Sequence, residues 1–222
     1  MELMEKEPDF IGPSRSALYT TLAVLLLSTI PGLLAPAAKP LAYLVPLVYL
    51  LVERKRAGRS WEEIGVKART YGQDLLANWH LFLIVAIIFQ LVPPLLARAR
   101  WPQLLDHIRA RVPLLAPSQV GALIASIVVI AFVEELIYRG LLQQRLAWYL
   151  RSGLAVLTAS FLFALQHYTA GLPTIVAADL LLVFVDGLVY GWIFARCHNA
   201  LVSWTAHVAA DVVAVAILLL RV

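Results

Sequence analysis

Two adjacent glutamates and an arginine stand at the end of an apolar stretch in the second half of the chain. Glu134 and Glu135 directly follow the apolar residues 120–133, and Arg139 comes four positions after Glu135. On a helix, an acid four residues before a base forms a favourable ion pair, so Arg139 is expected to neutralise Glu135. Glu134 points about 100° away from Glu135 around the helix and is left available as a general base for water. The plainer interpretation is a charged helix end at an interface with water.

Two histidines stand in later apolar stretches. His167 comes four residues after Phe163, and His207 comes four residues before Asp211, a spacing that puts imidazole and carboxylate on one helix face. Taken singly, His167 is more often a hydrogen-bonded packing residue, and His207 with Asp211 a local hydrogen bond. Taken with Glu134, they supply a carboxylate, two imidazoles and a further acid. That set suits the activation of water and the stabilisation of a tetrahedral oxyanion.

The composition of the chain places these side chains in a membrane. Of the 222 residues, 61% are hydrophobic and 14% are charged, whereas soluble domains have about 45–50% apolar and about 25% charged residues. A charged side chain at the centre of a bilayer costs about 2.5–3.5 kcal/mol. We therefore expect Glu134, His167 and His207 to converge on one hydrated cavity, with Asp211 pointing into the same space. The net charge of +4 does not indicate nucleic-acid binding, because the basic residues cluster at the ends of apolar stretches.

Seven apolar stretches are predicted to be helices that cross the membrane, since only helices and closed barrels span lipid and the alternating strands of a barrel are absent. The stretches are 16–35, 40–52, 75–97, 118–138, 153–170, 173–195 and 199–220. The 40–52 stretch is short for a span, which needs about 20 residues. The arginine-rich 98–117 stretch is expected to be an interfacial loop with a short amphipathic helix, or else an eighth span. The predicted fold is an all-α, polytopic transmembrane bundle of seven or eight helices.

The basic residues also predict an orientation for the bundle. With seven spans, twelve of the 18 Lys and Arg residues lie on the side of the N-terminus and six on the other side. The positive-inside rule then puts the N-terminus in the cytoplasm, with the helices in the cell (plasma) membrane. The predicted organisation is a cytoplasmic leader (1–15), N-terminal transmembrane helices with polar loops (16–117) and catalytic transmembrane helices (118–222).

The sixth apolar stretch carries two further acids. Asp179 and Asp186 are seven residues apart and therefore share one helix face. They either line the same cavity as the histidines or pair with Arg196, and both arrangements fit the spacing. Phe163 is a third residue expected to line the cavity.

The order and spacing of the motifs resemble those of the CAAX prenyl protease and bacteriocin-processing (CPBP, or Abi) membrane peptidases. That family has E-E-x-x-x-R, then F-x-x-x-H, then H-x-x-x-N or H-x-x-x-D near the C-terminus. The chain has EELIYR at 134–139, FALQH at 163–167 and HVAAD at 207–211. The resemblance covers about residues 118–215, and three motifs in order on apolar segments are far more specific than one.

The resemblance implies that Glu134 is the general base that activates water, assisted by His167, and that Glu135 with Arg139 is a structural ion pair. The family is often catalogued as metallopeptidases, and Glu134, His167 and His207 could supply three zinc ligands with an open fourth position. The chain has no H-E-x-x-H pair, and a glutamate cannot easily be both ligand and base. The preferred mechanism therefore requires no cofactor, and zinc is the alternative.

The last motif departs from part of the family. The resemblance implies that His207 and Asp211 bind the oxyanion of the peptide carbonyl, but the members that act on prenylated proteins usually have Asn in place of Asp211. An ionised carboxylate repels an oxyanion. Asp211 would therefore have to be protonated, or to orient His207 instead.

The function predicted from these residues is an intramembrane endopeptidase that cleaves a peptide bond near the membrane. Its partners would be the lipid bilayer and a peptide or membrane-protein substrate, for which a prenylated C-terminal motif is one family option. Two other classes remain open: a proton-coupled transporter, because chains of Asp, Glu and His form proton pathways, and a catalytically idle scaffold or immunity protein. The absence of an inverted repeat disfavours the transporter, and the intact motif set disfavours the idle protein.

Overall fold

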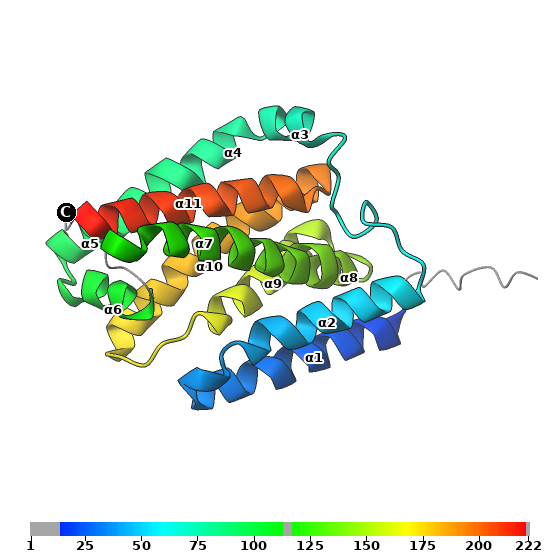
Figure 1. Ribbon diagram of the computed structural model, residues 1–222, viewed down its shortest axis with the longest axis horizontal. Helices are drawn as coiled ribbons and strands as arrows, with labels where there is room; N and C mark the ends of the chain where they lie inside the picture. Colours follow the sequence, from blue (N-terminus) through cyan, green and yellow to red (C-terminus); the bar gives the residue numbers. More distant parts are fainter. Residues whose placement is uncertain (1–13, 113–116, 221–222) are drawn as a thin grey trace, which may run out of the picture.

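A computed structural model describes residues 14–112 and 117–220 of the chain. In these residues the backbone is helical and contains no strand (Figure 1). The predicted all-α fold is thus confirmed for the described residues. The predicted leader lies, apart from its last two residues, outside them.

The helical stretch that begins at Val120 continues to Ala147, nine residues beyond the predicted end at 138. The long helices otherwise begin and end within four residues of the predicted apolar stretches. Their bounds are α1 (Arg15–Leu34), α2 (Leu41–Arg56), α3 (Tyr71–Ala77), α4 (Trp79–Leu83), α5 (Val92–Ala99), α6 (Gln103–Arg111), α7 (Val120–Glu135), α8 (Gln144–Ala147), α9 (Ser152–Gln166), α10 (Pro173–Cys197) and α11 (Ala200–Leu220). The predicted short helix in the 98–117 stretch is α6. A π-helical segment at residues 84–88 and a 3-10 turn at 89–91 join α4 to α5.

Five helical stretches of the described residues are long and apolar enough to cross a membrane. They are Arg15–Leu34, Trp79–Ala99, Val120–Ala147, Pro173–Cys197 and Ala200–Leu220. The other two predicted spans correspond to α2, with 16 residues, and α9, with 15 residues. Both are shorter than the roughly 20 residues that a bilayer requires. Helix length therefore supports five spans, and the predicted count of seven goes beyond it.

The helices form an elongated bundle in which α1 and α2 make a separate hairpin (Figure 1). In the rest of the bundle, α9 packs on α10, and α11 packs on both α7 and α10. The segment from α3 to α5 runs along α11, and α6 contacts α10 at the end of the bundle that holds the C-terminus. The helices that carry Glu134 (α7) and His207 (α11) and the end of α9 that carries His167 thus belong to the same part of the bundle.

A π-helical segment, Leu136–Gln143, lies inside the long helical stretch that runs from α7 into α8. All of its residues are buried, and it begins directly after Glu135. Short π-helical turns within α-helices occur often at functional sites. Gly140 allows the loop between α2 and α3 to lie close to the π-helical segment, because a Cβ atom at position 140 would lie only 2.5 Å from the carbonyl oxygen of Ile64.

The turn between α10 and α11 is held by the loop that precedes α3. The side chain of Asn199 donates to the carbonyl oxygen of Lys67 at 2.9 Å and to Asp74 at 2.8 Å. The backbone N–H of Ala200 donates to the carbonyl oxygen of Gly65 at 2.6 Å. Gly65 has a φ of 90°, a conformation that residues with a Cβ atom rarely adopt. These bonds fix where α11 begins and therefore where its histidine is presented.

Small residues bring α10 close to the helices beside it. A Cβ atom at Gly187 would lie 3.0 Å from the ring of Phe163, and one at Gly191 would lie 3.0 Å from the Gln143 side chain. Gln143 donates to the carbonyl oxygen of Gly191 at 2.9 Å. The close approach seats Phe163, one turn before the end of α9, between α10 and the π-helical segment.

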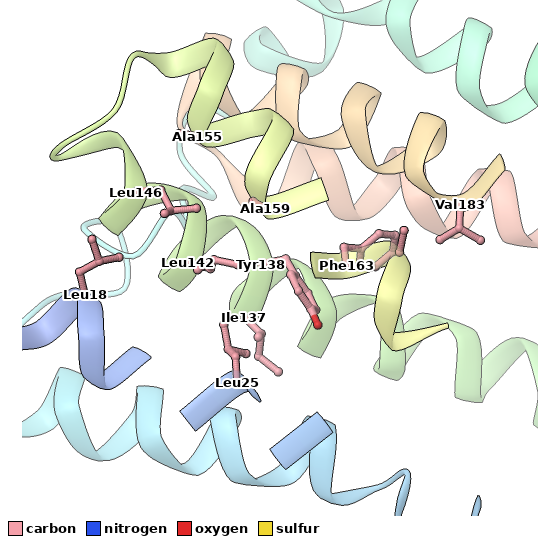
Figure 2. Close-up of a cluster of buried hydrophobic side chains, with 11 residues drawn as sticks. Leu18, Leu25, Ile137, Tyr138, Leu142, Leu146, Ala155, Ala159, Phe163 and Val183 are labelled. Carbon is pink, nitrogen blue, oxygen red and sulfur yellow. The ribbon is translucent and has the colours of Figure 1, made fainter. Parts of the chain in front are cut away.

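The largest cluster of buried apolar side chains joins the hairpin to the rest of the bundle (Figure 2). Leu25 of α1 lies beside Ile137 of the π-helical segment, and Leu18 of α1 lies beside Leu146 of α8. Tyr138 meets the ring of Phe163 edge-on at 5.3 Å. The N-terminal hairpin is therefore part of the same packed core as the predicted catalytic helices.

Candidate active site

Glu134 lies at the centre of a group of polar side chains from three helices. Its side chain is 5% exposed, and its two oxygens lie 3.9 Å from Nε2 of His167 and 3.6 Å from Nε2 of His207. Nε2 of His207 also lies 3.6 Å from a carboxylate oxygen of Asp211, whose side chain is 43% exposed. The predicted convergence of Glu134 with the two histidines is thus observed, and Asp211 faces the same ring.

His167 caps the C-terminal end of α9, and its ring is oriented by the backbone. Its Nδ1 lies 3.0 Å from the carbonyl oxygen of Phe163, to which an Nδ1–H donates. In the neutral ring this bond leaves Nε2 as a hydrogen-bond acceptor, and Nε2 is the atom that faces Glu134. Phe163 lies between the histidines, with its ring centre 4.7 Å from that of His167 and 5.7 Å from that of His207.

Glu135 is fully buried and has two partners. One oxygen lies 3.3 Å from Nε of Arg139, which is the ion pair predicted from the spacing. The other lies 3.1 Å from Nδ1 of His207, a contact that the sequence did not predict. A carboxylate bound to Nδ1 fixes the orientation of an imidazole and stabilises its charged form. Glu135 therefore holds the His207 ring as well as neutralising Arg139.

Arg139 and Tyr190 complete the surroundings of His207. Arg139 is fully buried, donates to the carbonyl oxygen of Gly187 at 3.3 Å, and has its guanidinium 5.2 Å from the centre of the Phe163 ring. Tyr190 of α10 is stacked on His207, with ring centres 4.6 Å apart and planes 20° apart. Stacking on one side and a carboxylate at Nδ1 leave the imidazole few other orientations. Sequence reasoning missed Tyr190, which no motif marks.

Two cavities adjoin the polar group, and His167, His207 and Asp211 line both. The larger, of about 250 Å³, is also lined by Glu134 and by Tyr43 of α2. The rest of its wall is mostly apolar and comes from α6, α7 and α11: Ile108, Val112, Leu123, Ser126, Ile127, Ile130, Ala131, Ala214, Val215 and Leu218. An extended substrate could reach Glu134 and the histidines through this cavity.

The smaller cavity, of about 110 Å³, contains the predicted cavity-lining residues Phe163, Asp179 and Asp186. Asp179 lies 3.5 Å from Nε2 of His107 on α6, and Asp186 accepts a hydrogen bond from Gln90 at 3.2 Å. Both acids thus face the cavity, the first of the two arrangements that their spacing allowed. The other proposed partner, Arg196, donates to Asn78 at 2.9 Å.

The same side chains include types that could bind a metal ion. Within residues 14–112 and 117–220, no group of three or more His, Cys, Asp or Glu side chains is arranged to hold a metal ion. Zinc ligands lie about 2.0–2.2 Å from the ion, and structural and catalytic zinc sites draw on at least three of them. Glu134, His167 and His207, the ligand set of the zinc alternative, do not form such a group in the part of the chain that the structure describes.

Residues 116–213 match the family described as type II CAAX prenyl endopeptidase Rce1-like. The chain carries an Rce1-like domain. The match contains all three motifs, from Glu134 to Asp211, and the resemblance recognised in the sequence is thereby confirmed. The Rce1-like domain begins just before α7 and leaves out α1 to α6. No curated protein and no solved structure matches the chain.

Proposed function

We propose that this protein is an intramembrane endopeptidase in which Glu134 activates the attacking water. The observation that best supports the proposal is the position of Glu134, buried between His167 and His207 at the wall of a cavity inside the Rce1-like domain. The nearby Arg139 forms its ion pair with Glu135 and not with Glu134. A buried carboxylate that faces imidazoles and a cavity is suited to proton transfer.

The first step is the deprotonation of water. Glu134 and His167 are 3.9 Å apart, so a water molecule to one side of the line between them could lie about 2.8 Å from both. Glu134 takes one proton of this water, and Nε2 of His167 accepts a hydrogen bond from the other. The oxygen then adds to the carbonyl carbon of the peptide bond and forms a tetrahedral oxyanion.

The second step is stabilisation and collapse of the oxyanion. His207 donates to the oxyanion from Nε2, which requires a ring protonated on both nitrogens, with Nδ1–H donated to Glu135. The carboxylates around the ring, those of Glu134, Glu135 and Asp211, supply the negative charge that such a ring requires. The proton held by Glu134 then passes to the amide nitrogen as the C–N bond breaks, which leaves a carboxylic acid and an amine.

The membrane arrangement is part of the same proposal. The distribution of Lys and Arg supports a cytoplasmic N-terminus in the cell membrane. We propose that α2 and α9 cross along with the five longer stretches to make seven spans. Their 16 and 15 residues give lengths of about 24 and about 22 Å, which a locally thinned bilayer accommodates.

Purified protein and fluorogenic peptides test the proposed function. The protein in detergent or nanodiscs is incubated with quenched peptides that end in a prenylated or an unmodified cysteine motif, and cleavage sites are read by mass spectrometry. Cleavage of either peptide supports the endopeptidase. If neither peptide is cleaved and the protein conducts protons across liposome membranes, a proton-coupled transporter becomes the better interpretation. If the protein shows no activity in either assay, the catalytically idle scaffold becomes the better interpretation.

Replacing Asp211 with Asn is expected to preserve or raise the cleavage rate. Asp211 is half-exposed at the cavity, 3.6 Å from Nε2 of His207, so the amide of an Asn could donate to the same oxyanion. One oxyanion donor is worth about 10²–10³ in kcat. The Asp211→Ala variant lacks both the charge and the donor and should be slower than wild type by about tenfold. Steady-state kinetics decide, and an Asp211→Asn variant as slow as Asp211→Ala would show that the carboxylate itself is needed.

A further inference from the structure

Tyr43 reaches the candidate active site from a helix outside the Rce1-like domain. It lies on α2, in the first turn of that helix, and its side chain hydrogen-bonds the Glu134 carboxylate. Tyr43 also lines the 250 Å³ cavity beside Glu134, His167 and His207. The match to the family begins at residue 116, so no motif of the matched domain includes this tyrosine.

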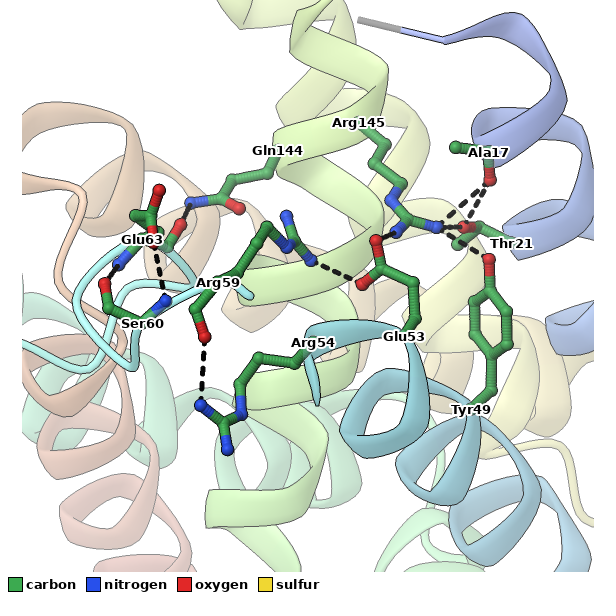
Figure 3. Close-up of polar contacts among 10 residues, drawn as sticks. All are labelled: Ala17, Thr21, Tyr49, Glu53, Arg54, Arg59, Ser60, Glu63, Gln144 and Arg145. Carbon is green, nitrogen blue, oxygen red and sulfur yellow. Dashed lines mark hydrogen bonds and ion pairs between the residues drawn. The ribbon is translucent and has the colours of Figure 1, made fainter. Parts of the chain in front are cut away.

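A second set of contacts, called the clamp at Arg145 below, attaches the α1–α2 hairpin to the helical stretch of α7 and α8 that also carries Glu134. Arg145 of α8 is fully buried and lies 2.7 Å from a carboxylate oxygen of Glu53, near the end of α2 (Figure 3). It donates to the hydroxyl of Tyr49 at 2.9 Å, to the hydroxyl of Thr21, and to the carbonyl oxygen of Ala17 at 3.1 Å. Arg145 thus binds both helices of the hairpin at once.

The two points of attachment have matching spacings. Tyr43 and Glu53 are ten residues apart on α2, or about 15 Å, and Glu134 and Arg145 are eleven apart on the α7–α8 stretch, or about 16 Å. Both helical stretches run in the same direction in Figure 1. The clamp at Arg145 therefore sets α2 in the register that brings Tyr43 to Glu134. Arg59 adds to the clamp by binding the second oxygen of Glu53 at 2.8 Å.

We propose that Tyr43 is a positioning residue for Glu134, an inference that rests on the proposed role of Glu134 as the general base. A carboxylate can accept hydrogen bonds at two oxygens. Donation from the phenol fixes the plane of the carboxylate, so that it faces the histidines and the water in the cavity. Charge-assisted bonds of this kind are stronger than neutral ones. The α1–α2 hairpin is therefore part of the catalytic unit.

The test compares Tyr43→Phe with Tyr71→Phe. Tyr71 lies on α3, is similarly half-buried, and its hydroxyl hydrogen-bonds Thr205 on the His207-bearing helix at 2.9 Å, so the control loses the same group from another bond. Tyr43→Phe is expected to lower kcat by about 10- to 100-fold with KM unchanged, because misplacing a reacting group by about 1 Å has effects of this size. Tyr71→Phe should keep its kcat. Incorporating 3-fluorotyrosine at position 43, which retains the donor, should restore turnover.

A melting experiment keeps the inference separate from the proposed function. Tyr43→Phe should lower Tm by about 2–4 °C in the wild-type background and by clearly less in the Glu134→Gln background, because the neutral amide oxygen of Gln accepts a weaker hydrogen bond than a carboxylate. Equal Tm shifts in the two backgrounds, or a wild-type kcat in Tyr43→Phe, overturn the inference and leave the endopeptidase standing. A wild-type protein that cleaves no peptide, with unequal shifts, overturns the proposed function instead, and the catalytic role of Tyr43 falls with it.

Discussion

The Glu134→Gln variant is expected to lose peptide cleavage by about 100- to 10,000-fold, the range that a general base contributes. Gln has the shape of Glu and leaves the neighbouring helices undisturbed, but it cannot take a proton from water. Its amide can still meet the two histidines, which lie 3.6 and 3.9 Å from the carboxylate. The fold should therefore survive. Turnover of the quenched peptide and Tm in detergent measure the two effects.

A surface carboxylate provides the control for this variant. Asp106 lies on α6 with its side chain 79% exposed and pairs with Arg109 at 3.3 Å. The Asp106→Asn change removes one negative charge, as Glu134→Gln does, but at a side chain that lines neither of the two cavities. It should keep the wild-type kcat. A Glu134→Gln protein that cleaves at the rate of Asp106→Asn would show that another group activates the water.

The positions of the long helices in the sequence could be predicted because a chain that crosses lipid must form its backbone hydrogen bonds internally. Apolar stretches of about 20 residues must be helical when they cross a bilayer, so the bounds of α1, α7, α10 and α11 followed from hydrophobicity alone. The number of spans could not be settled in the same way. Helix α9 is apolar, but its 15 residues alone do not mark it as a span, and α2 ends in the charged residues ERKR at 53–56.

The site was predictable where chemistry and spacing were local, and not where they depended on distant packing. The Glu135–Arg139 pair follows from a four-residue spacing, and the convergence of Glu134 with two histidines follows from the cost of isolated polar groups in lipid. The contact of Glu135 with His207 joins residues 72 positions apart. It depends on how α11 packs against α7, which periodicity does not encode.

Two further features had no sequence signal. The helix geometry changes from α to π at Leu136, inside the stretch 118–138 that was predicted as one helix, and the helical stretch continues to Ala147. Tyr43 stands in an apolar stretch where a tyrosine is unremarkable, and only the placement of α2 against α7 brings it to Glu134.

The Glu135→Gln variant is expected to lower the free energy of unfolding by about 3–5 kcal/mol, the cost of breaking a buried ion pair from one side. Glu135 and Arg139 are both fully buried, 3.3 Å apart, and the variant leaves the guanidinium without a charged partner, beside the carbonyl oxygen of Gly187 and the rings of Phe163 and Tyr190. Cleavage should fall as well, because His207 loses the charged partner at Nδ1. Denaturant or thermal unfolding in detergent measures the first effect, and peptide turnover measures the second.

The double variant Glu135→Gln with Arg139→Met separates the ion pair from the contact to His207. Removing the arginine removes the uncompensated buried charge, so the double variant should be more stable than Glu135→Gln alone. Its cleavage should stay low, since a methionine side chain cannot restore the carboxylate that His207 has lost. If Glu135→Gln unfolds at the same temperature as Glu134→Gln, the two adjacent acids do not divide the structural and chemical roles. A double variant with full activity would mean that the contact of Glu135 with Nδ1 of His207 plays no part in catalysis.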